Sequence, residues 1–157
     1  MPRDPMKTRD KGSLLFLLFL FLWPVILLAL FLAGVRVWEA AQKPVIRHRV
    51  MEYRDGLTAQ AEYDLAAPNG TVRTRDAMIP GSGDAVWYET ARFGPGPSSR
   101  AYGYCCSAGG DPRPYPGMED YDAAPVGSGF RWEEPGGDNG CYVEHIAGDF
   151  YYYEVWF

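Results

Sequence analysis

LLFLLFLFLWPVILLALFLAGV, residues 14–35, is the stretch that decides how this chain is organised. The run holds 22 residues and no charged or strongly polar side chain. As an α-helix of about 1.5 Å per residue it would be about 33 Å long, enough to cross a hydrocarbon core of about 30 Å. Pro24 lies inside the run, and membrane helices tolerate proline where the freed backbone groups find other partners. The stretch predicts one transmembrane helix.

A cleaved secretory signal is the alternative interpretation of this run. Signal sequences have an apolar core of about 7 to 15 residues followed by a small-x-small cleavage site. The run here is longer, and at its exit a bulky residue stands two positions before each obvious small one, as Phe31 does before Ala33. These features favour an uncleaved signal-anchor helix.

The anchor divides the chain into four parts. We expect a basic cytoplasmic tail over 1–13, the membrane helix over 14–35, a juxtamembrane connector over 36–44 and a β-rich domain over 45–157. Lys and Arg nearly balance on the two flanks of the run, so the positive-inside rule does not choose an orientation. The run does occupy the position of a signal sequence behind a basic N-terminus. We therefore expect a single-pass protein of the cytoplasmic (inner) membrane, with its N-terminus inside and its domain outside.

Short extended runs separated by turn residues fill the rest of the chain. Asp55-Gly56 stands between the first two runs and is a strong hairpin signal. Short strands at intervals of about 8 to 15 residues, with no helical period, favour a small antiparallel β sandwich or barrel of about seven to eight strands. The expected strands are 45–54, 57–65, 71–79, 85–93, 101–107, 129–134, 141–147 and 149–157.

Residues 108–128 form the longest interruption, a segment rich in Gly, Pro and acidic residues. Structureless loops of this length are uncommon in compact domains and are often functional or mobile. Ten acidic residues lie between Asp111 and Glu154, so the C-terminal half carries most of the negative charge. Such a field repels nucleic acid, and nucleic-acid binding is not expected.

Three cysteines, Cys105, Cys106 and Cys141, suggest one structural bridge. Adjacent Cα atoms lie about 3.8 Å apart, closer than the roughly 4.4 Å that a disulfide usually needs, so Cys105 and Cys106 are not expected to pair with each other. A bridge from Cys141 to either of them would suit a small exported domain. Strand alternation should send Cys105 and Cys106 to opposite faces.

No catalytic, cofactor or metal motif is assembled in the sequence. The three cysteines and His145 lack the C-x₂₋₄-C spacing of zinc sites. The acids around Glu119 do not match a calcium-binding loop, and a solvated acidic loop is the simpler interpretation. A thiol enzyme or hydrolase would have to combine His145 with a cysteine or a carboxylate. We therefore expect a protein that is not an enzyme and that needs no cofactor.

Aromatic residues are the most distinctive feature of the domain. All eleven tyrosines lie outside the apolar run, and both faces of the last expected strand are mostly apolar. Core packing accounts for most of these side chains, but Tyr and Trp also dominate binding hot spots. We expect a membrane-anchored binding or accessory module that contacts a protein or saccharide partner. An immunity-type inhibitor of an exported toxin is the alternative, because an acidic face can block a basic active site. The candidate contact residues are Tyr115, Tyr121, Tyr152 and Trp156.

Overall fold

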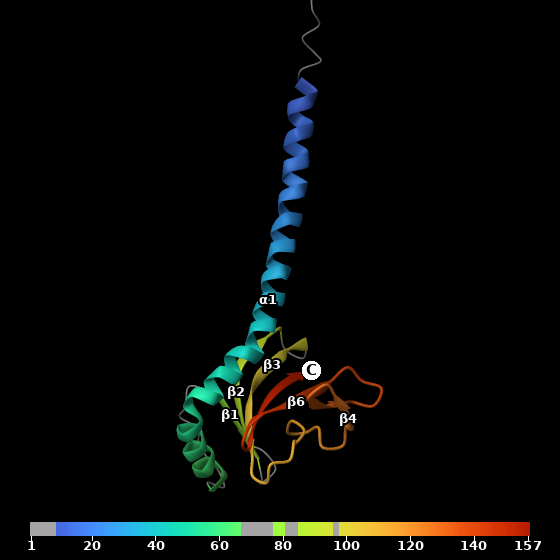
Figure 1. Cartoon of the computed structure of the whole chain (residues 1–157). Helices are drawn as coiled ribbons and strands as arrows, with labels where there is room; N and C mark the ends of the chain where they lie inside the picture. Colours follow the sequence, from blue (N-terminus) through green and yellow to red (C-terminus); the bar gives the residue numbers. More distant parts are fainter. Residues whose placement is uncertain (1–8, 67–76, 81–84, 96–97) are drawn as a thin grey trace, which may run out of the picture. The chain divides into compact units, whose positions relative to one another are not determined.

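The computed structural model describes residues 9–66, 77–80, 85–95 and 98–157 (Figure 1). One long helix, α1 (Arg9–Ala66), precedes the strands β1 (Ala77–Pro80), β2 (Ala85–Phe93), β3 (Arg100–Ser107), β4 (Asp122–Val126), β5 (Gly129–Glu133), β6 (Gly140–Ala147) and β7 (Phe150–Trp156). The chain separates into two compact units, Met1–Ala41 and Gln42–Phe157.

The apolar run forms part of α1, as expected. The helical segment Phe19–Ala66 contains a strongly apolar stretch of 18 residues, and none of that stretch is buried within the molecule. By length and composition it is a candidate membrane span, and a signal sequence near an N-terminus would share these properties. The apolar side chains of this part of α1 are therefore not buried by any other part of the chain that the structure describes.

The two strands expected at 45–54 and 57–65 are wrong, because both segments belong to α1. The expected Asp55-Gly56 hairpin is absent as well, because α1 continues through these residues. The helix kinks at Tyr53, where φ is −108° and ψ is 19°. Leu57, Ala61 and Leu65 explain the error, because a spacing of four residues fits both strand alternation and one face of a helix. The Ala, Gln, Glu and Leu residues of this segment are strong helix formers, and they decide the outcome.

The strands form one open antiparallel sheet in the order β1-β2-β3-β7-β6-β5-β4. Six strands, β2 to β7, make up the main sheet, against the seven or eight expected. The four-residue β1 pairs with the outer side of β2. Within the described residues β1 and β4 stay at opposite edges and no second sheet faces the first. The expected sandwich or barrel is thus replaced by a single sheet, and residues 71–76 of the third expected strand lie outside the described residues.

Each face of the sheet has its own hydrophobic core. On one side, here called the helix face, residues 42–66 of α1, here called its second half, lie along the strands (Figure 1), and their apolar side chains join the core there. Ile46, Val50 and Ala61 of α1 are buried there among aromatic side chains of β2, β3 and β7. The opposite side, here called the loop face, is packed with Trp87, Tyr153 and their neighbours. A single sheet remains stable because both of its apolar faces are covered.

The segment 108–128, expected as a structureless loop, covers the loop face. Tyr115 and Met118 are buried there, with exposed fractions of 7 % and 3 %. Backbone hydrogen bonds from Met118 to Tyr115 and from Tyr121 to Met118 fold the segment into turns. Its last part, Asp122–Val126, is strand β4. The segment is therefore a structural part of the domain.

A buried carboxylate fastens α1 to the helix face. Glu144 of β6 is only 4 % exposed, yet its carboxylate accepts hydrogen bonds from several side chains. Lys43 donates from Nζ, Arg47 donates from Nη1 at 2.6 Å, and the Tyr142 hydroxyl donates at 2.6 Å. Lys43 and Arg47 are four residues apart and share one side of the helix. This cluster fixes which side of α1 faces the sheet.

The environment of Glu144 keeps its carboxyl ionised. Burial by itself would raise the pKa of Glu144, but the hydrogen bonds from Lys43 and Tyr142 outweigh it and hold the pKa below its ordinary value. A carboxyl with a lowered folded-state pKa stabilises the fold above its unfolded-state pKa, and the contribution is lost as the pH falls through the folded-state value.

We predict that Glu144→Gln destabilises the domain by about 1 to 3 kcal/mol, since it leaves two cations without their counter-charge while both remain partly solvated. The measurement is urea unfolding of the full chain in detergent, followed by tryptophan fluorescence between pH 3 and pH 7. The deficit should shrink toward acid, because protonation removes the same interaction from the natural chain. Glu133→Gln is the matched control, as Glu133 pairs with Arg131 on the surface. Equal unfolding of both variants at pH 7 would contradict the role of Glu144.

Candidate functional site

The three cysteines are free and buried, so the expected disulfide is wrong. Strand order gives the reason: β7 lies between β3, which carries Cys105, and β6, which carries Cys141. Two strand spacings amount to about 9.6 Å, beyond the roughly 7 Å limit for bridged Cα atoms. Along β7 the two cysteines are also offset, because Cys105 pairs with Tyr151 and Cys141 pairs with Val155.

Cys105 and Cys106 do point to opposite faces, as strand alternation predicts. Cys105 packs in the core of the loop face with Cys141, whereas Cys106 packs in the core of the helix face. The sheet itself therefore separates Cys106 from Cys141. Neither of the two pairings considered from the sequence is possible without moving a strand.

The thiols lack the environment of a nucleophile. Burial raises the pKa of Cys141 to about 11. It also raises the pKa of Cys106 to about 11, with a further contribution from the negative charges of Asp149 and Glu62. Burial places the pKa of Cys105 well above its ordinary value. Reactive cysteines instead have lowered pKa values and are accessible, so these thiols are inert, protonated core residues.

His145 lies apart from these thiols. It is exposed on β6, its Nε2 lies 2.8 Å from the carbonyl oxygen of Gly148, and its ring meets the edge of Tyr151 at 5.2 Å between centroids. Tyr151 stands between His145 and Cys105 in the cross-strand row. Glu144 points to the other face of the sheet, where α1 binds it. The structure does not bring His145 together with a thiol or with that carboxylate.

The acids expected to form a solvated surface are exposed. Asp111, Glu119, Asp120 and Asp122 are all accessible. Within the described part of the chain no group of three or more His, Cys, Asp or Glu side chains is arranged to hold a metal ion. The negative charge of these four acids therefore lies on the surface.

The four aromatic residues expected to contact a partner lie at different depths. Tyr152 is 2 % exposed in the core of the helix face and Tyr115 is 7 % exposed in the core of the loop face. Tyr121 is half-buried beside the latter core. Trp156 is half-buried at the rim of the sheet and lines a surface hollow. Of the four, Trp156 is the one that combines an aromatic ring with a concave surface.

The hollow at Trp156 has a volume of about 220 Å³. It lies on the helix-face side of strands β3 to β7, beyond the part that α1 covers. We call this region the Trp156 surface, and its residues are Arg100, Val126, Arg131, Tyr142, Glu154 and Trp156.

Two guanidinium groups hold the Trp156 ring. The Cζ atom of Arg131 lies 4.8 Å from the centre of the ring and the Cζ atom of Arg100 lies 5.9 Å from it, both in cation–π range. Arg100 is itself bound to Glu154 at 2.6 Å, and Arg131 is bound to Glu133 at 2.8 Å. The ring is therefore fixed in place before any partner arrives.

Gly140 makes room for this ring. A Cβ atom at position 140 would lie 2.5 Å from Cζ2 of Trp156 and 2.6 Å from the carbonyl oxygen of Trp132. Only glycine lets the indole lie this close to β6. The sequence gives Trp156 as a candidate, but it does not reveal its support, because Arg100, Arg131 and Gly140 come from three different strands.

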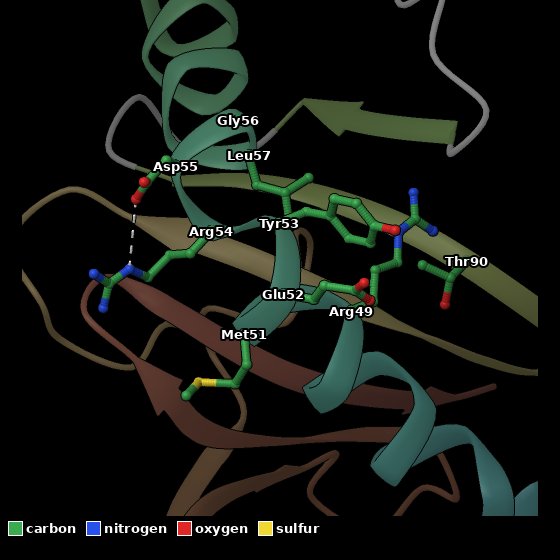
Figure 2. A pocket seen from close by; sticks show the side chains of 9 residues that line it. All are labelled: Arg49, Met51, Glu52, Tyr53, Arg54, Asp55, Gly56, Leu57 and Thr90. Carbon is green, nitrogen blue, oxygen red and sulfur yellow. Dashed lines mark ion pairs between the residues drawn. The ribbon is translucent and has the colours of Figure 1, made fainter.

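A second hollow lies beside the kink of α1 (Figure 2). It is open and has a volume of about 1050 Å³. Its walls are mostly exposed helix residues with Thr90 of β2, and Arg54 and Asp55 form an ion pair of 4.0 Å at its margin. The charged side chains shown there are of both signs and no buried polar group points into the hollow from the residues that line it. The hollow offers shape but no chemistry that selects a ligand.

No protein-family model, no curated protein and no solved structure matches this chain.

We predict that none of the three native thiols reacts with a maleimide in the folded chain, and that all three react after denaturation without any reductant. The physical reason is burial, with exposed fractions of 0 %, 6 % and 0 % for Cys105, Cys106 and Cys141. Adducts counted by mass spectrometry provide the measurement, and Asp138→Cys, at an exposed turn position, is the reactive control. A chain that needs reduction before all native thiols react would contain a disulfide and contradict the structure.

Proposed function

We propose that this protein is a membrane-anchored, non-catalytic binding or accessory module whose domain contacts a partner protein through the Trp156 surface. The observation that carries the proposal is the half-buried indole of Trp156, held between Arg100 and Arg131 at the uncovered rim of the sheet. Tryptophan and arginine are the residues most enriched at binding hot spots, and a ring that is already fixed loses little entropy on binding.

The dimensions of the hollow favour a protein partner over a saccharide. Small-molecule pockets usually measure about 300 to 1,000 Å³ and enclose most of their ligand. The hollow at Trp156 is smaller, at about 220 Å³. It suits one side chain of a protein that covers the surrounding strands. A sugar ring stacked on Trp156 is the alternative that the experiment must separate.

Strand β4 extends this surface. Every residue of β4 is exposed, and Val126, which lines the hollow, is 42 % exposed. Exposed apolar residues that adjoin one another on a folded surface mark interaction sites more often than scattered ones do. Asp122 and Ala124 face the same side of the sheet as Val126, because alternate residues of a strand share a face, and they make the contact region larger than the hollow alone.

We further propose that the chain stays anchored in the cytoplasmic membrane, with its N-terminus inside and its domain outside. The position of the apolar helix behind a basic N-terminus supports this orientation. Because the three cysteines are free, no disulfide supports export, and the position of the apolar helix is the feature that supports this orientation. Labelling of intact cells with a membrane-impermeant maleimide tests it: Asp138→Cys should react from outside, and reaction only after lysis would place the domain in the cytoplasm.

An inhibitor of a basic exported toxin is a second candidate function. Exposed acidic residues crowd one half of the domain, among them Asp111, Glu119, Asp120, Asp122, Glu133 and Asp138. Acidic surfaces accelerate association with basic partners and can cover a basic active site. This candidate shares the binding-module architecture and differs only in the identity of the partner.

We predict that a photo-crosslinking amino acid at position 126 captures a partner protein in cells. Val126 lines the Trp156 surface, whereas Tyr63 is 71 % exposed on α1 and provides the matched control position. Trp156→Ala should weaken the adduct at 126 at least tenfold, provided that the variant keeps its thermal unfolding transition. The measurement is the adduct band after irradiation.

Equal adducts from positions 126 and 63, or none from 126, would contradict a protein contact at this surface. Retention of the natural chain, but not of Trp156→Ala, on immobilised envelope polysaccharide would instead assign a saccharide partner.

A further inference from the structure

Strand β4 is an edge of the sheet with an open side. It pairs antiparallel with β5, and none of the described strands pairs with its other side. All five of its residues, Asp122–Val126, are exposed. Open edges present unpaired backbone groups and are templates for pairing with another chain. The groups that β4 presents can be identified from the turn that follows it.

The turn fixes which backbone groups face outward. Gly127 and Ser128 form a two-residue loop between the paired residues Val126 and Gly129. Gly127 has a φ of 61°, as the first residue of a type II′ hairpin turn requires. In such a hairpin the pair that flanks the loop exchanges two hydrogen bonds, and the pairs then alternate along the ladder.

The alternation places the backbone groups of Ala123 and Pro125 on the open side. Val126, Ala124 and Asp122 direct their N–H and C=O groups toward β5, opposite Gly129, Arg131 and Glu133. Proline has no N–H to donate. The open side of β4 therefore offers two carbonyl oxygens and a single donor, the N–H of Ala123.

A second copy of the chain is a poor partner for this edge. If two β4 strands met antiparallel about Ala124, Ala123 of each copy would face Pro125 of the other. A complete ladder would form four hydrogen bonds there, but the two that need a donor at position 125 are missing.

We infer that Pro125 closes the open edge of β4 to a second copy of this chain. The proline lies at the one kind of position in β4 where it costs the domain no hydrogen bond, because its nitrogen faces away from β5. It leaves the side chains of β4 and the adjoining Trp156 surface available to a different partner.

The test compares Pro125→Val with Pro135→Val in the full chain, purified in detergent. Pro135 is also exposed, but it lies in the turn between β5 and β6. The expected result is that Pro125→Val self-associates about tenfold or more tightly than the natural chain, the factor expected for two restored hydrogen bonds. Pro135→Val should remain at the natural level. Sedimentation equilibrium over a range of protein concentrations provides the measurement.

A second variant keeps the test informative if Pro125→Val misfolds. Ala124→Cys places a thiol at the centre of the symmetric pairing and leaves Pro125 in place. A short bifunctional maleimide should give no copy-to-copy adduct with this variant alone, and a strong adduct with Ala124→Cys combined with Pro125→Ala, which also restores the N–H at position 125. An adduct from Ala124→Cys alone, or monomeric Pro125→Val of natural fold, would overturn the inference.

Discussion

The buried carboxylate of Glu144 is the constraint on which the arrangement of this domain depends. A carboxylate taken out of water needs cations and hydrogen-bond donors around it, and removal of one partner of such a pair is strongly destabilising. Two of its donors, Lys43 and Arg47, come from α1, and another is Tyr142 on the same strand as Glu144. The helix can satisfy Glu144 with only one of its sides, and that side is the one that carries Ile46 and Val50 into the core.

The rest of the architecture follows from a sheet with two apolar faces. Side chains of β3 and β7 alternate between the two cores, so neither face can be left to solvent. The second half of α1 covers one face, and the segment that contains Tyr115 and Met118 covers the other. Neither the second half of α1 nor this segment covers β4, whose residues are all exposed. The exposed residues of β4, the half-buried Trp156 and the open edge guarded by Pro125 all lie where this coverage stops.

Much of the sheet can be predicted from the sequence, because local signals agree there. The alternation of β2, β3, β6 and β7, and the turns between them, locate these strands within about one residue of their observed bounds. The second half of α1 could not be predicted in this way, since Leu57, Ala61 and Leu65 satisfy both periods. Strand β4 could not be predicted, because it contains Pro125 and lies in a segment rich in glycine and acidic residues, a composition typical of loops. The prediction of a disulfide was wrong for a different reason. The local sequence pattern does not reveal the order of the strands, and β7 lies between the strands of Cys105 and Cys141. For the candidate site, Trp156 was predicted but its supports on other strands were not.

The central claim is that the second half of α1 is an integral layer of the domain, fastened through Glu144. Amide hydrogen exchange of the full chain in detergent tests this claim most directly. The account predicts that the amides around Ile46 and Val50 exchange with the same free energy of opening as those of β3, β6 and β7, and that Glu144→Gln lowers both together. Exchange of the helix amides at a much lower opening free energy, while the strands stay protected, would show that the helix is not part of the cooperative core and would contradict the account.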